Sequence, residues 1–157
     1  MRTIPEHLAA VLAAATPLPP VRVDVRAAHG LTLAADSPAR LPVPPFTNSA
    51  MDGFLVHSAD LEGGAPWTLP VVADVPAGAA PVPLERGSAL RIMTGAPVAG
   101  DPELLRVIPV EDTDIASGPG ALPAEVTIRD LRPARTHIRR AGENIAVGEP
   151  ALVAGTV

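Results

Sequence analysis

The chain has 157 residues, the size of one domain or two small ones, and carries a formal net charge of −5. All 12 basic residues are Arg, and they form neither a basic run nor a pattern interleaved with aromatic residues, which argues against a nucleic-acid partner. The absence of Cys excludes disulfides, thiolate metal sites and cysteine nucleophiles.

A helix is the first element that the sequence predicts. Thr3 and Glu6 have the spacing of a capping box, and Pro5 is tolerated in a first helical turn. The apolar residues that follow share one helical face: Leu8, Val11, Leu12 and Ala15. Glu6 and His7 interrupt the run, and no apolar stretch approaches membrane-spanning length, so we expect a cytoplasmic protein without a signal peptide or membrane contact.

Short extended segments are predicted after this helix. Residues 21–25 alternate as in a strand, residues 26–29 read as a helical turn closed by Gly30, and residues 31–35 return as a short strand. The passage 37–46 contains four Pro residues, which favour an extended connector.

From Gly53 onward the sequence pattern consists of short apolar runs separated by Gly-containing turns. Strands are expected near residues 53–57, 68–75, 88–93, 105–110 and 124–130. With only three aromatic residues in the chain, the core must consist mainly of Val, Leu, Ile and Ala. These features predict a compact β-barrel or sandwich. From His137 the pattern becomes a short strand, a turn around residues 142–144 and a final segment over 146–157.

Two loops combine small and polar residues in patterns that could bind a ligand. In residues 47–53, Asp52 could bind a hard cation such as Mg²⁺, and Gly53 could let a ligand approach the backbone. In residues 91–97, Thr94 would present a hydroxyl and the amides near Gly95 would form a shallow anion nest. Ordinary turns are the simpler explanation of both patterns on residue types alone.

Two charged segments are further candidates. Residues 111–114 hold three carboxylates that could bind a cation, although a solvated loop is the simpler interpretation. Arg139 and Arg140 could receive an anion such as phosphate, or they could form a solvated edge. The four His residues are isolated and lack metal-ligand spacing.

Taken together and in this order, the motifs resemble a known family. LPVPPFTNSAMDGFLVHSADL and RIMTGAPV resemble two signatures of the molybdopterin molybdenumtransferases, the family that includes the E domain of gephyrin, and RRAGENIAVGEPALVAGT is similar to a third. The resemblance covers essentially the whole chain. It implies insertion of molybdate into adenylylated molybdopterin to form molybdenum cofactor, with Mg²⁺ as the metal.

The resemblance also implies roles for individual residues. Asp52 and Thr94 match positions at or near the family's active site, with Asp52 as the magnesium ligand. The expected substrate-binding residues are Ser49, Gly95, Glu111, Arg140 and Asn144. Asn144 is a departure, since the family usually has Asp there; it keeps an acceptor oxygen but lacks the charge. The loop 100–106 is a second departure, because the family has a tighter link at this point.

An α+β, β-rich architecture follows from the same resemblance. Residues 1–46 and 137–157 would form an elongated first domain, into which a β-barrel-like domain of residues 47–136 is inserted. The molybdopterin-binding domain would lie beyond Val157, so we expect an active transferase at full length and an inactive isolated chain. The implied partners are a second copy, the missing C-terminal domains and a molybdopterin adenylyltransferase. The alternative is a stand-alone dimerisation or protein-binding module without catalysis.

Overall fold

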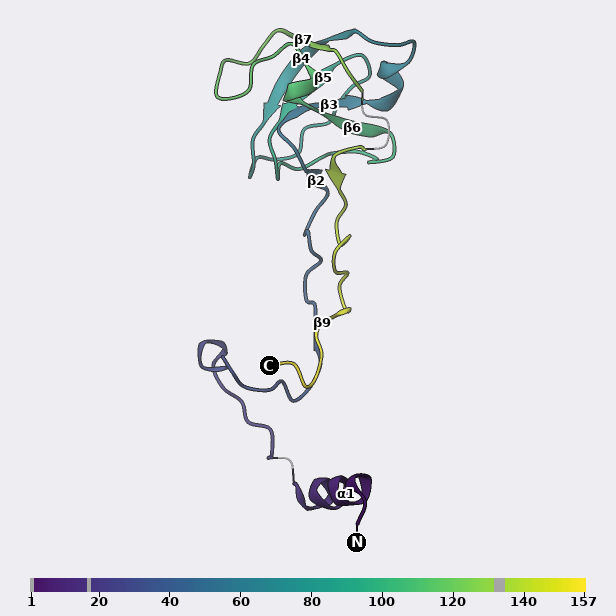
Figure 1. The fold of residues 1–157 in the computed structure, drawn as a ribbon. Helices are drawn as coiled ribbons and strands as arrows, with labels where there is room; N and C mark the ends of the chain where they lie inside the picture. Colours follow the sequence, from purple (N-terminus) through teal and green to yellow (C-terminus); the bar gives the residue numbers. More distant parts are fainter. Residues whose placement is uncertain (1, 17, 132–134) are drawn as a thin grey trace. The chain divides into compact units, whose positions relative to one another are not determined.

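The computed structural model describes residues 2–16, 18–131 and 135–157 (Figure 1). Its internal contacts divide the chain into a smaller unit, residues 1–37 with 150–157, and a larger unit, residues 38–149. The domain limits expected at 46/47 and 136/137 stay a prediction.

The smaller unit begins with helix α1, Ile4–Ala14, as predicted. Its capping box is complete, because the Thr3 hydroxyl accepts from the Glu6 amide at 3.4 Å and the Thr3 amide donates to Glu6 Oε2 at 2.7 Å. No described residue of α1 is buried. The leucines of its apolar face, Leu8 and Leu12, are 56% and 62% exposed, so this face has no cover.

The predicted strands at 21–25 and 31–35 are wrong. The structure has a short 3₁₀ helix, η1 (Val25–Ala27), whose first turn is capped where Asp24 accepts from the Arg26 amide at 2.9 Å. Most apolar side chains of both segments are about half exposed or more. A strand needs a hydrogen-bonded neighbour and a face to bury, and alternation in the sequence supplies neither.

Instead, hydrogen bonds join residues 33–36 of the smaller unit to its C-terminal residues 154–156. Leu33 donates to the Thr156 carbonyl and accepts from the Gly155 amide, both at 2.8 Å. The Ala154 amide donates to Asp36 Oδ1 at 2.8 Å. Next to these contacts, β1 (Ser37–Pro38) pairs with β9 (Pro150–Leu152).

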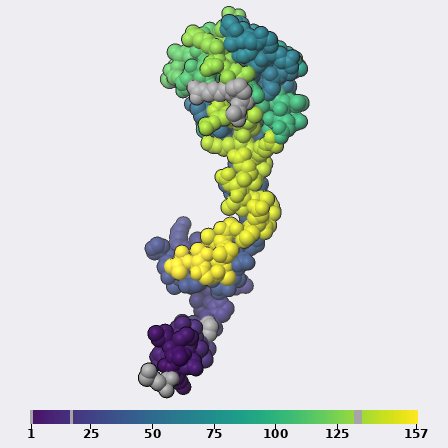
Figure 2. Space-filling view, turned by 45° about the vertical axis from the view of Figure 1, so that its right-hand side comes forward, coloured from purple at the N-terminus to yellow at the C-terminus, as the bar shows by residue number. Residues whose placement is uncertain are grey.

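The larger unit starts and finishes with a two-stranded ribbon. The Ala39 amide donates to the Glu149 carbonyl at 2.8 Å, and the Val43 amide donates to the Ile145 carbonyl at 2.9 Å. The ribbon ends where β2 (Asn48–Ser49) pairs with β8 (Ile138–Arg139) in antiparallel register. Figure 2 shows the yellow-green run of the ribbon, which covers most of its blue partner in this view. The extended connector and the short strand after His137 are therefore confirmed.

A curled five-stranded sheet forms the rest of this unit (Figure 1). Its strands are β3 (Gly53–His57), β4 (Trp67–Val75), β5 (Ala89–Ile92), β6 (Leu105–Pro109) and β7 (Glu125–Ile128). The order is β6-β3-β5-β4-β7, antiparallel except for the parallel pair β4–β5. All five strands lie where the sequence predicts them, which confirms a β-rich fold; α1 is the one α-helix among the described residues.

The sheet is buried on both faces by mainly aliphatic side chains. One face contributes Phe54, Val56 and Ile128 to a first cluster, and the other contributes Leu55 and Ile92 to a second. Short 3₁₀ helices follow two of the strands, η2 (Ser58–Leu61) after β3 and η3 (Val110–Asp112) after β6. Within residues 2–16, 18–131 and 135–157, no helix is both long and apolar enough to span a bilayer.

Candidate functional site

Three chain segments meet at one edge of the curled sheet. β3 runs antiparallel to both of its neighbours, and its first residue, Gly53, pairs with Ile92 at the end of β5 and with Pro109 at the end of β6. The loop before β3 therefore lies beside the loops that follow β5 and β6. These loops carry three of the predicted site residues: Asp52, Thr94 and Glu111.

Asp52 and Thr94 are in direct contact. Asp52 Oδ1 accepts from the Thr94 amide and from the Thr94 hydroxyl, each at 2.7 Å. Both hydrogen bonds end on the same oxygen, so Oδ2 takes no part in this contact. The Thr94 amide, and then its hydroxyl, lower the pKa of Asp52 below the ordinary value of 3.8, because both stabilise the carboxylate. Both residues are exposed. The site therefore presents a solvent-facing negative charge.

The predicted anion nest near Gly95 is wrong. The Thr94 amide is bound to Asp52, the Gly95 amide donates to the Ser49 carbonyl at 2.9 Å, and the Ala96 amide donates to the Met93 carbonyl at 2.9 Å. A nest needs consecutive amides that are available to a ligand. In this loop the protein itself supplies the acceptors.

Ser49 serves the turn that leads to Asp52. It is fully buried, and its hydroxyl donates to the Met51 carbonyl at 2.6 Å. Its backbone amide donates to the Ala96 carbonyl at 3.0 Å, while its carbonyl accepts from Gly95. The structure thus brings Ser49 and Gly95 together through their backbones. Substrate binding by either residue stays a prediction.

Gly53 is needed for close strand packing rather than for ligand approach. A Cβ atom at this position would lie 1.9 Å from the Ile108 carbonyl oxygen on β6. The space beside its Cα atom is therefore filled by the neighbouring strand. A side chain here would push apart β3 and β6, which fix the position of the adjacent Asp52.

The three carboxylates of residues 111–114 lie in different surroundings. Glu111 is exposed in η3, next to Val110, whose amide donates to the Asp52 carbonyl at 3.1 Å. Asp112 is buried, whereas Asp114 accepts from the Thr127 amide at 2.8 Å. In the described part of the chain no three His, Asp or Glu side chains are grouped so that they could hold a metal ion. The segment therefore offers no three-carboxylate cluster for a cation, and substrate binding by Glu111 stays a prediction.

Arg140 and Asn144 lie on the ribbon of the larger unit. Arg140 Nη2 donates to Glu103 Oε1, and the Arg140 amide donates to Glu143 Oε2 at 2.8 Å. Asn144 is exposed, and its amide donates to the Val43 carbonyl at 3.0 Å. None of these contacts involves Asp52. Glu103, which binds Arg140, lies in the loop 100–106. The departure of this loop from the family pattern was the only hint in the sequence that Glu103 has a role.

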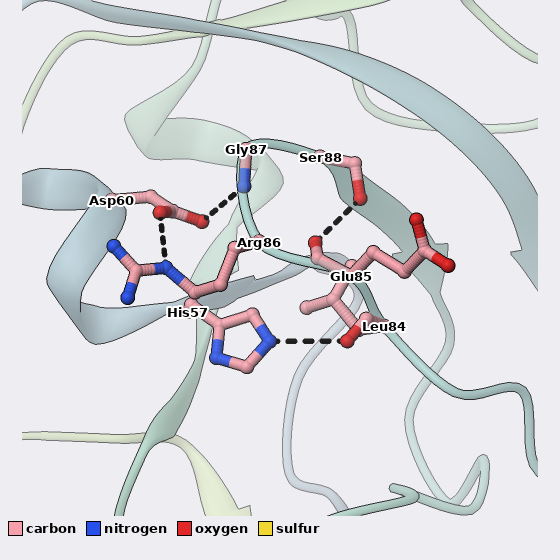
Figure 3. Close-up of polar contacts among 7 residues, drawn as sticks. All are labelled: His57, Asp60, Leu84, Glu85, Arg86, Gly87 and Ser88. Carbon is pink, nitrogen blue, oxygen red and sulfur yellow. Dashed lines mark hydrogen bonds and ion pairs between the residues drawn. The ribbon is translucent and has the colours of Figure 1, made fainter.

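A second polar group lies beside η2 and was not singled out by the sequence (Figure 3). Asp60 accepts from Arg86 Nε at 2.6 Å and from the Gly87 amide at 2.8 Å. A His57 ring nitrogen lies 3.1 Å from the Leu84 carbonyl oxygen. These bonds attach the loop before β5 to the end of β3. A depression of about 500 Å³ lies here, lined by His57, Ser58, Ala59, Glu62, Arg86, Glu103 and Leu104.

Comparison with known proteins identifies relatives along the whole chain. The molybdopterin molybdenumtransferase 2 of Mycobacterium tuberculosis is 39% identical over 161 residues, and the molybdopterin molybdenumtransferase 1 of the same organism is 32% identical over 177 residues. Each alignment covers 100% of this chain but only 38% and 39% of the relative. The chain thus spans a little over a third of the length of these relatives.

Solved structures and a family description agree with this result. The crystal structure of the molybdopterin biosynthesis moeA protein from Pyrococcus horikoshii OT3 superposes with a TM-score of 0.68 at 28% identity, covering 85% of this chain and 34% of that one. Residues 2–157 match the family described as MoeA N-terminal region (domain I and II). With the match extending over nearly every residue, this chain belongs to the MoeA N-terminal region family.

Proposed function

We propose that the chain is the N-terminal part of a molybdopterin molybdenumtransferase, which inserts molybdate into adenylylated molybdopterin to form molybdenum cofactor. The observation that carries this proposal is the alignment of the entire chain, at 39% identity, with a relative of that name. Because this alignment covers 38% of the relative, we place the molybdopterin-binding domain in the part of the enzyme that these residues do not match.

Asp52 is the proposed centre of the chemistry that this part contributes. Its Oδ1 is bound by Thr94, while Oδ2 takes no part in that contact and the residue is exposed. Mg²⁺ is commonly held by one or two carboxylates, with waters and substrate phosphates completing its shell. A single carboxylate oxygen fits that mode of binding. The described residues do not form a cluster of three ligands that could hold the ion without substrate. Bound there, Mg²⁺ would neutralise charge on the phosphates of the adenylylated substrate.

The remaining predicted residues are proposed to bind substrate less directly. Ser49 and Gly95 would hold the two loops that carry Asp52 and Thr94, as their mutual hydrogen bond supports. Glu111 follows Val110, which bonds to the Asp52 carbonyl. Arg140 and Asn144 would act from the ribbon, Arg140 as a cation for phosphate or molybdate and Asn144 as a neutral acceptor in place of the usual Asp.

We also propose the arrangement of the complete enzyme. Residues 47–136 would form a β-barrel-like domain inserted into an elongated domain of residues 1–46 and 137–157, and the curled sheet supports the barrel-like part. The enzyme would be a cytoplasmic homodimer that receives its substrate from a molybdopterin adenylyltransferase. The uncovered apolar face of α1 supports a partner at that helix.

The test is molybdenum insertion from adenylylated molybdopterin, molybdate and Mg²⁺. The full-length enzyme should form molybdenum cofactor, whereas the isolated 157-residue chain should not. Asp52→Ala should reduce insertion on the order of a hundredfold, as expected for loss of a group that stabilises charge. Normal insertion in this variant would show that the loop is only scaffold, and absence of insertion by the wild-type enzyme would favour a dimerisation or protein-binding module.

A further inference from the structure

The Thr94 hydroxyl has one proton, and the structure shows where that proton goes. Thr94 Oγ1 donates to Asp52 Oδ1 at 2.7 Å, and the Thr94 amide donates to the same oxygen at 2.7 Å. A hydroxyl group is one donor and an acceptor through its lone pairs. While the bond to Asp52 is intact, Thr94 can therefore accept from water or an N–H group, or contact a cation, but it has nothing left to donate.

This arrangement conflicts with direct recognition of the substrate anions by Thr94. At neutral pH molybdate and phosphate present oxygens that mainly accept hydrogen bonds, so binding them through Thr94 would require its proton. The neighbouring amides are also engaged, since Gly95 donates to Ser49 and Ala96 donates to Met93. The Thr94 loop as a whole therefore offers little to an oxyanion.

From this geometry we infer that Thr94 is a positioning residue, which fixes the Asp52 carboxylate by two hydrogen bonds to Oδ1 and leaves Oδ2 as the oxygen that meets the ligand. The inference rests on the proposed function, because it says that, within that site, Thr94 acts through Asp52. Gly53 contributes to the same result, since its lack of a side chain lets β6 lie against the start of β3 and fixes the backbone next to Asp52.

A double-mutant cycle in the full-length enzyme tests the inference. Thr94→Val removes the hydroxyl but keeps the branched shape and the amide bond, and it should lower kcat about tenfold, the size expected for a bond to a charged group. In an Asp52→Ala background the same change should add less than about a twofold effect, because residues that act through one group are not additive. Thr94→Ser keeps the hydroxyl and should restore kcat to within about threefold of wild type.

Two further measurements separate positioning from substrate binding. The KM for molybdate should stay within about twofold of wild type in Thr94→Val, because the lost proton was bound to Asp52. In the full-length enzyme without substrate or metal, the Thr94 amide should exchange with deuterium faster in Asp52→Ala than in wild type, and stay slow in Thr94→Val. Thr68→Val is the matched control: it removes an exposed hydroxyl, 3.1 Å from that of Thr127 on the β4–β7 pair, and should leave insertion unchanged.

The possible results distinguish this inference from the proposed function. Additive effects of Thr94→Val and Asp52→Ala, or a raised KM for molybdate, would overturn the positioning role while leaving the enzyme a molybdenumtransferase. Unchanged exchange of the Thr94 amide in Asp52→Ala would overturn the contact itself. If the wild-type enzyme inserts no molybdenum, the proposed function fails first and the positioning role fails with it.

Discussion

The amide and the hydroxyl of Thr94 both donate to Oδ1 of Asp52, so one carboxylate oxygen joins two loops that lie 42 residues apart in the sequence. Asp52→Ala removes both bonds at an exposed position, where hydrogen bonds contribute modestly. We expect the free energy of unfolding to fall by about 1 kcal/mol in urea titrations. Asp101→Ala is the control, since the Asp101 side chain accepts from the Glu103 amide within its own turn, and should cost less than about 0.5 kcal/mol. Equal costs would mean that other contacts hold the two loops.

Gly53→Ala should be the more damaging change next to the site. Its Cβ atom would meet the Ile108 carbonyl oxygen at 1.9 Å, and backbone cannot move aside as a side chain can. Overpacking of this kind costs about 1–3 kcal/mol, measurable as a lower urea midpoint. Gly120→Ala serves as the matched control, because nothing lies within 4 Å of the added atom. Similar midpoints for the two variants would show that β3 and β6 separate easily.

The pair formed by Asp74 and Arg91 should make stability depend on pH. Arg91 donates to both carboxylate oxygens, Nε at 3.0 Å and Nη2 at 2.5 Å, and these bonds lower the pKa of Asp74 below its ordinary 3.8. A lowered pKa in the folded state gives stability that is present above 3.8 and lost as the pH falls through the folded value.

Asp74→Asn is the variant that measures this contribution. At pH 7 it should be less stable than wild type by about 1 kcal/mol, as for a partly exposed ion pair. The difference should shrink once the pH drops below the ordinary aspartate range, which parallel urea titrations from pH 7 to pH 2 can follow. A difference that stays constant over that range would contradict the ionic origin.

Glu103 holds the guanidinium of Arg140, and this has a consequence for substrate binding. The side chains are 65% and 53% exposed, so Glu103→Gln should change the free energy of unfolding by less than about 0.5 kcal/mol. If Arg140 binds an anionic substrate, releasing it should lower the KM for that substrate about twofold to threefold, while Arg140→Ala should raise it. Unchanged KM values in both variants would remove Arg140 from the proposed site.

The uncovered face of α1 predicts association. Leu8 and Leu12 are both more than half exposed, and apolar faces of this kind are normally covered by a partner. If the proposed homodimer forms through this face, replacing both by Glu should shift the full-length enzyme from dimer to monomer in sedimentation analysis. Ala9→Glu with Ala13→Glu adds the same charge to the same helix away from that face. Dissociation by both pairs of changes would indicate a general loss of the helix.

The sequence predicted most of the larger unit and little of the smaller one. Local rules were sufficient for α1, whose capping box needs only Thr3 and Glu6, and for strands bounded by Gly-containing turns. They failed at residues 21–25, where alternation was read as a strand although no strand of the described residues pairs with this segment. Pairing is a long-range property, which a local pattern does not contain.

The candidate site shows the same limit. The residue pattern and the resemblance both singled out Asp52 and Thr94, but their contact depends on β3 and β5 lying side by side. The amides near Gly95 looked available because the sequence does not show that Ser49 and Asp52 supply their acceptors. Gly53 was assigned to ligand approach, whereas the neighbouring strand occupies the space.

The smaller unit is made from two segments separated by the whole of residues 38–149. In an unfolded chain, joining Leu33 to Thr156 means closing a loop of well over a hundred residues, which costs several kcal/mol in chain entropy. Once the larger unit has folded, the Ala39–Glu149 hydrogen bond holds its two ends together. Bringing Leu33 to Thr156 then requires little further loss of chain entropy. We therefore expect the sheet to form before the contacts among residues 33–36 and 154–156.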